Sequence, residues 1–223
     1  MSRAVEFLGL PPTYLADSPE AFVAPQNLSF IEQRAAGKRL LDYGCATAGY
    51  SLVLGKRGYS CTAIDVEPEL IEQARSHGVD ARVVEPEAPI PFGDSSFDTV
   101  VLFETLEHVP DYEFVLSEAR RVTRNNVLIS VPNCTETPLL AQASTVLDHY
   151  LAEDHVNFFT LQQLDETLGR LFASHEIFEG DYIDQALYRQ LFPFPFNYGV
   201  MVLGRLGVLR KTLSYRLFAD ARR

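Results

Sequence analysis

Short apolar runs alternate along the chain with segments of helical periodicity. The runs are rich in Val, Ile, Leu and Phe, which is typical of buried parallel strands, and they cover residues 38–43, 60–66, 80–85, 97–103 and 126–131. Between them, Pro68 predicts the first turn of one helix, Gly78 its end, and Asp111 the N-cap of another. The alternation predicts an α/β fold in which a doubly wound, mostly parallel sheet has helices on both faces.

Acidic residues stand at the carboxyl ends of three of these runs. Asp42 ends the first run, just before a turn of small residues that opens a helix, and Asp65 and Glu104 end the second and fourth. Ligands of doubly wound sheets bind beyond the carboxyl ends of the strands. Asp65 follows Asp42 by 23 residues, close to the separation at which dinucleotide-type folds place a ribose-binding carboxylate. We therefore expect a nucleoside-bearing cofactor.

The C-terminal third departs from this alternation. Residues 134–184 follow the fifth run, where substrate contacts are commonly built, and Thr160 with Gln163 predicts a capping box for a helix over 161–172. Residues 185–211 are unusually apolar and aromatic, with FPFPF predicting a turn between two helical pieces. We expect an insertion packed on the sheet, a lid over an apolar substrate, a dimer face or a membrane-surface patch. The stretch SYRLFAD predicts the last strand, within 212–223.

Composition limits the classes of function. The 223 residues, 47% hydrophobic and 22% charged, fit one soluble globular domain with a substantial core. The net charge of −11 disfavours nucleic acid as a partner. The three cysteines are far apart and form no CxxC, so neither a disulfide framework nor a thiolate zinc site is expected. No run reaches ~18 apolar residues and the N-terminus lacks an apolar signal core, so we expect a cytoplasmic protein.

Four stretches, in order, resemble the motifs of class I S-adenosylmethionine-dependent methyltransferases: LLDYGCATAGYS, AIDVEPELIEQAR, PIPFGDSSFDTVVLFETLEHV and LISVPN. The likeness covers about residues 38–133, the expected cofactor-binding core, with residues 1–37 as an N-terminal helical cap of the same single domain. It implies a Rossmann-like sheet of seven strands with a C-terminal helical insertion. The family's first motif usually reads D-x-G-x-G-x-G, and this chain has Ala46 and Ala48 at the second and third glycines.

These two alanines leave two interpretations open. Negative φ would tolerate alanine and give a slightly narrowed, working site, whereas a left-handed conformation would be strained by ~1 kcal/mol or more. The alternative to a working site is a non-catalytic module that has lost affinity for the cofactor. The resemblance implies cofactor contacts at seven positions: the methionine end at Asp42, Gly44 and Ala46, the ribose at Asp65, the adenine at Val66 and Glu85, and the pocket lining at Glu104.

The segment ETLEH carries a second candidate site. Glu104, Glu107 and His108 are spaced i, i+3 and i+4, so a helical turn after the strand would bring them to one face, where they could bind Mg²⁺, Mn²⁺, Zn²⁺ or Fe²⁺. The spacing is similar to that of ubiquinone-biosynthesis O-methyltransferases and of small-RNA 3′-terminal 2′-O-methyltransferases. In the RNA group a further His follows, which makes His155 a candidate fourth ligand. Alternatively, His108 or His155 is a general base, or these side chains line the cofactor pocket or are structural; His149 is a further candidate base.

Together these motifs predict transfer of the sulfonium methyl of S-adenosylmethionine to a hydroxyl on a small molecule or glycan. HVNFFTLQQL resembles a stretch of bacterial methyltransferases that act on sugars and other small metabolites. Two alternatives stay open at this point, methylation of an RNA 3′ end and a cofactor-binding module without catalysis.

Overall fold

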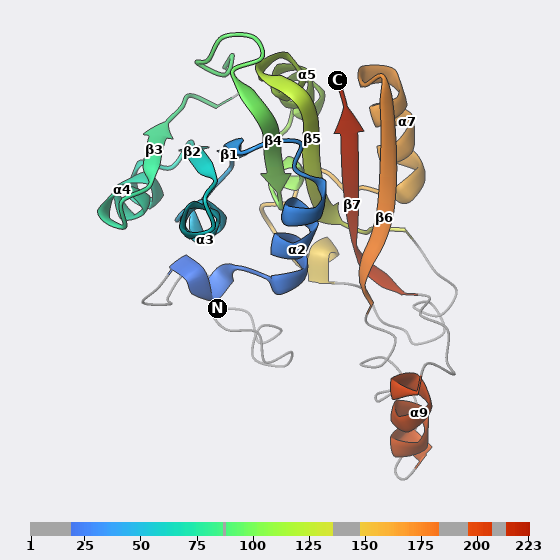
Figure 1. Cartoon of the computed structure of the whole chain (residues 1–223). Coiled ribbons are helices and arrows are strands. Elements are labelled where there is room, and N and C mark those ends of the chain that lie inside the picture. Colours follow the sequence, from blue (N-terminus) through green and yellow to red (C-terminus); the bar gives the residue numbers. More distant parts are fainter. Residues whose placement is uncertain (1–18, 87, 136–147, 183–195, 207–212) are drawn as a thin grey trace.

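The computed structural model describes residues 19–86, 88–135, 148–182, 196–206 and 213–223. Its strands form one seven-stranded sheet in the order β3-β2-β1-β4-β5-β7-β6 (Figure 1). The strands are β1 (Arg39–Tyr43), β2 (Ser60–Asp65), β3 (Asp80–Val83), β4 (Phe97–Phe103), β5 (Thr123–Pro132), β6 (Ser174–Tyr182) and β7 (Ser214–Arg222).

Strands β1 to β5 run parallel, and β7 is antiparallel to both β5 and β6. The structure thus confirms the predicted seven-stranded, mostly parallel sheet. The strand ends differ slightly from the apolar runs: β3 stops at Val83, and β5 extends from Thr123 to Pro132. The last strand lies within the expected residues 212–223.

Helices cover both faces of the sheet (Figure 1). They are α2 (Pro25–Arg34), α3 (Gly49–Lys56), α4 (Pro68–Ser76), α5 (Tyr112–Val122), α7 (Leu161–Leu171) and α9 (Phe196–Arg205), with short 3₁₀ turns η1 (Pro19–Phe22), η2 (Leu106–His108) and η3 (Asp148–Leu151). Because side chains alternate along β1, Leu40 packs on the face shared with α2 and α3, whereas Leu41 packs on the face of α5 and α7. Helix α4 packs on Ala63 of β2.

Three of the predicted helix starts are confirmed. Pro68 is the first residue of α4, and the Asp111 carboxylate accepts a hydrogen bond from the Phe114 backbone N–H at 3.0 Å. Thr160 and Gln163 form a reciprocal capping box at the start of α7. These caps fix where the helices begin, and the preceding loops therefore stay at the edge of the sheet where the carboxyl ends of the parallel strands lie.

Helix α9 lies within residues 185–211, as the apolar pattern predicts, and stands apart from the sheet in Figure 1. Its large apolar side chains are exposed at five described positions, Phe196, Tyr198, Val202, Leu203 and Leu206, the last just beyond the helix. Most of FPFPF and residues 1–18 of the expected N-terminal cap lie outside the described residues. Within the described residues, no helix has both the length and the apolar character needed to cross a bilayer.

Candidate functional site

The turn between β1 and α3 has an unusual backbone. Gly44 has φ +70°, and a Cβ at this position would collide with the Thr105 side chain, so only glycine fits. Ala46 and Ala48 also have positive φ, 47° and 59°. The alanines therefore occupy left-handed positions, the strained alternative of the two that the sequence left open.

Two carboxylates flank this turn. Asp42 is buried and accepts a hydrogen bond from the Ser51 hydroxyl at 2.7 Å. Burial, opposed in part by this hydrogen bond, raises the pKa of Asp42 to about 6. Asp65, at the end of β2, accepts backbone N–H groups on both oxygens, from Ala46 at 2.8 Å and from Glu67 at 3.0 Å. These contacts hold the Asp65 carboxylate against the turn between β1 and α3.

Two cavities adjoin at the carboxyl ends of β1, β2 and β4. The larger, about 580 Å³, is lined among others by Asp65, Val66, Leu70, Val84, Thr105 and His108. The smaller, about 280 Å³, is lined among others by Asn27, Asp42, Thr47, Tyr50, Phe103 and Arg216. Gly44, Ala46 and Glu104 line both, so the two cavities meet at the turn and at the end of β4.

Six of the seven predicted cofactor residues line one or both cavities, namely Asp42, Gly44, Ala46, Asp65, Val66 and Glu104. Glu85 differs from them, because its side chain is exposed and the neighbouring Val84 and Pro86 line the larger cavity instead. The chain leaves β3 at Val83, two residues before the predicted end of this strand. The assignment of Glu85 to the adenine therefore stays a prediction.

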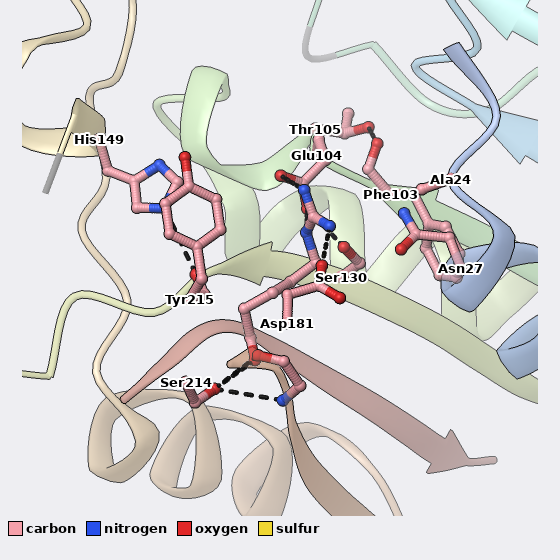
Figure 2. A network of polar contacts seen from close by, with 12 residues as sticks. Ala24, Asn27, Phe103, Glu104, Thr105, Ser130, His149, Asp181, Ser214 and Tyr215 are labelled. Carbon is pink, nitrogen blue, oxygen red and sulfur yellow. Dashed lines mark hydrogen bonds and ion pairs between the residues drawn. The ribbon is translucent and has the colours of Figure 1, made fainter. Parts of the chain in front are cut away.

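Glu104 ends β4 in a left-handed conformation, with φ +51°. Its two carboxylate oxygens accept hydrogen bonds from Arg216 Nε at 3.0 Å and Arg216 Nη2 at 3.1 Å. The Ser130 hydroxyl also donates to Glu104, and Asp181 forms a second ion pair with Arg216. Figure 2 shows Glu104, Ser130 and Asp181 gathered in this network. The Glu104 carboxylate is therefore held by a bidentate ion pair.

A second group of polar side chains lies beyond Glu104. Ligand atoms of Glu107, His108 and His155 all lie within 4.8 Å of one another. The structure thus brings together three of the four predicted metal ligands, whereas Glu104 is held by Arg216 and is not in this group. Backbone N–H groups of Val156 and Asn157 donate to the Glu107 carbonyl at 2.8 and 3.1 Å, which anchors the loop that carries His155.

Electrostatics within this group favour a neutral imidazole and an uncharged acid. Glu107 is 1% exposed and its Oε2 atom has no hydrogen-bond partner. Burial, with a smaller contribution from Glu104, raises the pKa of Glu107 well above its ordinary value. Burial and the neighbouring His108 lower the pKa of His155. His155 is therefore available as a ligand or a base near neutral pH.

His108 connects this group to the larger cavity, which it lines. Its Nδ1 atom lies 3.1 Å from the Asp154 carbonyl oxygen, and its ring meets the His155 ring edge-on at 4.8 Å between centroids. His149 is buried, and its ring is stacked on that of His155 at 6.1 Å between centroids. Figure 2 shows His149 beside Tyr215, whose ring is tilted against it at 4.1 Å. The buried His149 ring therefore packs against the His155 ring.

Asn27, Tyr50 and Arg216 line the smaller cavity and are absent from the sequence-based prediction. Asn27 is 1% exposed, donates from Nδ2 to the Tyr50 hydroxyl at 2.9 Å, and leaves its Oδ1 atom without a partner. Arg216 has a side chain that is 15% exposed. These residues come from α2, α3 and β7, and nothing in their local patterns indicates that the fold brings them together.

Comparison with known proteins finds methyltransferase relatives for part of the chain. Residues 41–131 match the family model described as a methyltransferase domain. The ubiquinone biosynthesis O-methyltransferase of Xanthomonas oryzae pv. oryzae is 32% identical over 148 residues, which are 61% of this chain and 62% of that protein. The match thus spans less than two thirds of this relative.

Solved structures agree on the fold. A SAM-dependent methyltransferase from Archaeoglobus fulgidus aligns with TM-score 0.66 and 16% identity over 92% of this chain and 95% of its own. The geranyl diphosphate C-methyltransferase of Streptomyces coelicolor A3(2), solved with Mg²⁺, geranyl diphosphate and S-adenosyl-L-homocysteine, aligns with TM-score 0.61 and 13% identity over 89% and 79%. The fold that the sequence-based resemblance implies is therefore confirmed, and the chain has the class I methyltransferase fold.

Proposed function

We propose that this chain, whose residues 41–131 match a methyltransferase domain, transfers the sulfonium methyl of S-adenosylmethionine to a hydroxyl of a small molecule or glycan. One observation carries the proposal: two adjoining cavities meet at a glycine turn, with Asp65 in one and Asp42 with Arg216 in the other. This arrangement suits a ligand with a nucleoside at one end and a charged amino-acid group at the other.

Asp65 is our candidate for the ribose. A carboxylate has about four acceptor sites, and the backbone N–H groups of Ala46 and Glu67 occupy two. Two sites are left for the two ribose hydroxyls. Val66 and Val84 supply apolar walls for the adenine in the same cavity. The missing Cβ of Gly44 makes room for the Thr105 side chain, and Gly44 itself lines both cavities.

Methyl transfer needs the acceptor oxygen in line with the sulfur–methyl bond, so positioning is the main task of the protein. The oxygen must also lose its proton. His108 and His155 lie beside the larger cavity, and a neutral imidazole there accepts that proton as a general base. The name of the Xanthomonas relative, an O-methyltransferase, supports oxygen as the methylated atom, and the net charge of −11 does not support RNA as the acceptor.

A divalent cation fits the same three side chains. Glu107, His108 and His155 offer one oxygen and two nitrogens, and the buried Oε2 of Glu107 lacks any partner, which a cation would provide. A bound cation would lower the pKa of an acceptor hydroxyl. Exhaustive chelation should then abolish activity, and added Mg²⁺, Mn²⁺ or Zn²⁺ should restore it. Activity that survives chelation would leave His108 and His155 as bases alone.

The test of the proposed reaction combines binding with turnover. The chain should release S-adenosylhomocysteine from S-adenosylmethionine in the presence of phenolic or sugar hydroxyl acceptors, and Asp65→Ala should weaken cofactor binding. Thr62→Ala is a suitable control, because Thr62 lies on the same strand and bonds to Asp80, outside both cavities. A chain that binds the cofactor but methylates no acceptor would favour the non-catalytic alternative. A cytoplasmic location stays a prediction.

We also propose that α9 contacts an anionic lipid surface. Its exposed apolar residues Tyr198, Val202 and Leu206 are spaced by four along the chain, and therefore share one side of the helix. Residues 185–211 contain four basic and no acidic residues, so the rest of this chain of net charge −11 carries −15. Apolar side chains beside basic ones are typical of segments that bind at membrane surfaces.

Sedimentation with phosphatidylglycerol vesicles tests this contact. The chain should bind these vesicles and bind phosphatidylcholine vesicles far less, with binding reduced by salt. The double variant Val202→Asp, Leu206→Asp should not bind, whereas Leu161→Asp, which changes an exposed apolar residue of α7, should bind as before. Absence of binding to both kinds of vesicle, or formation of dimers through α9, would contradict the proposal.

A further inference from the structure

The smaller cavity is lined by the guanidinium group of Arg216 and by Asn27, whose Oδ1 atom has no hydrogen-bond partner. Asp42 is also part of the lining. The cavity shares Gly44, Ala46 and Glu104 with the larger one, where the nucleoside is proposed to bind. Its occupant is therefore the part of the ligand that continues past the nucleoside.

The guanidinium group of Arg216 is fixed in position and retains free donors. Hydrogen bonds to Glu104 use Nε and Nη2, and the pair with Asp181 uses Nη1. A guanidinium has five N–H groups, so two of them lack a partner among the described residues. Both Glu104 and Asp181 have positive φ, 51° and 52°. This is a costly backbone conformation, which the fold maintains on both sides of one arginine.

Acceptors lie in the same cavity. Asn27 Oδ1 is buried without a partner, although the amide nitrogen of the same side chain is satisfied by Tyr50. A buried carbonyl oxygen that lacks a donor is costly, and a ligand N–H would remove that cost. Asp42 adds a buried carboxylate. Asp42, Glu104 and Arg216 together carry one net negative charge when all are ionised.

We infer that Arg216 binds the carboxylate of the methionine part of the cofactor and that Asn27 Oδ1 and Asp42 accept hydrogen bonds from its ammonium group. The inference rests on the proposed function. The ammonium, carboxylate and sulfonium of that moiety sum to one positive charge, which is opposite in sign to the net charge of these side chains and of Asp181 beside them. Arg216 is thus a binding residue of β7 that selects for an intact amino-acid group.

Paired ligands test this assignment by a readout other than activity. Calorimetry compares S-adenosylhomocysteine with 5′-methylthioadenosine, which has the same nucleoside and thioether but no amino-acid group. Arg216→Gln should weaken binding of S-adenosylhomocysteine by about ten- to a hundred-fold, the usual effect of a charged hydrogen-bonded pair. The same variant should change 5′-methylthioadenosine binding by less than about two-fold. Asn27→Leu should act selectively in the same direction.

Two further variants keep the result interpretable. Arg222→Gln changes an arginine of the same strand that pairs with Asp220, outside both cavities, and should alter neither affinity. If Arg216→Gln fails to fold, Arg216→Lys retains the charge but loses the planar fork, and should still weaken S-adenosylhomocysteine selectively. Equal losses for both ligands, or no loss, would overturn the inference alone. A wild-type chain that binds neither ligand would overturn the proposed function with it.

Discussion

Asp42 provides a test of whether the site is built at the expense of stability. Its carboxylate is buried and receives one side-chain hydrogen bond, from Ser51. The folded pKa of about 6 exceeds the ordinary value of 3.8, so ionisation of Asp42 opposes folding. The penalty is absent below about pH 4, grows as pH rises to about 6, and then stays constant. A difference of about two pKa units corresponds to roughly 3 kcal/mol.

Asp42→Asn removes the ionisation and keeps the shape. We expect the apo variant to be more stable than the wild type by roughly 1–3 kcal/mol at pH 7.5, a gain that shrinks at pH 5.5 and disappears near pH 4. Other titrating groups are common to both proteins and cancel in the difference. The same variant should bind S-adenosylmethionine more weakly, because the ammonium loses a charged acceptor. Gains in stability at a cost in function are typical of binding sites.

Urea unfolding followed by circular dichroism at several pH values measures this difference. Asp98→Asn is a matched control, because the Asp98 carboxylate accepts backbone N–H groups of Lys38 and Arg39 at 3.1 and 3.0 Å and lies outside both cavities. That variant should lose stability. If Asp42→Asn were less stable than the wild type at pH 7.5, or if its gain did not depend on pH, the reasoning on desolvation would be wrong.

Four further substitutions test the turn, the buried Glu107 and the cap of α5. Ala46→Gly should raise the free energy of unfolding in urea by about 0.5–1 kcal/mol, because glycine adopts positive φ freely. Ala48→Gly should leave it nearly unchanged, because relief of the strain is offset by loss of the fully buried Cβ, which contributes about 0.8 kcal/mol. A large loss of stability at either position would argue against the left-handed conformation. Glu107→Gln should leave the melting temperature at pH 7.5 unchanged or raise it, because ionisation of the buried Glu107 opposes folding. The variant should also lose binding of Mn²⁺ or Zn²⁺, measured by calorimetry. Unaltered metal binding would exclude Glu107 as a ligand. Asp111→Ala should cost about 1 kcal/mol through the lost cap of α5, and an unaltered urea midpoint would contradict the cap.

The central parallel strands could be predicted because they are largely buried on both faces. Strands β1 and β4 and the second half of β5 therefore read as apolar runs, and the helix cap at Asp111 lies between β4 and β5. Strand β6 has no such signal. It lies at the edge of the sheet, only half-buried, and its sequence SHEIFEGDY mixes acidic and apolar residues. The pattern alone did not place it, and the seventh strand was expected chiefly from the family resemblance.

Some residues of the candidate site could likewise be predicted from the sequence, and others could not. Asp42, Gly44 and Asp65 follow strand ends, so their positions at the cleft follow from the topology. The partner of Glu104 could not be predicted, because Arg216 lies 112 residues away on an antiparallel strand. The signs of φ at Ala46 and Ala48 were also open, since alanine is compatible with either interpretation until the turn is seen. The pattern also could not show that Glu104 binds Arg216 while Glu107 and His108 gather with His155.

The central claim is that the two adjoining cavities bind S-adenosylmethionine. Isothermal titration of the purified chain with S-adenosylhomocysteine measures this most directly, without any knowledge of the acceptor. The account predicts saturable binding of one ligand per chain, weakened at least about ten-fold in Asp65→Ala by loss of the charged hydrogen bonds to the ribose. No binding heat at high micromolar ligand, or equal affinity of the Asp65→Ala variant, would contradict it.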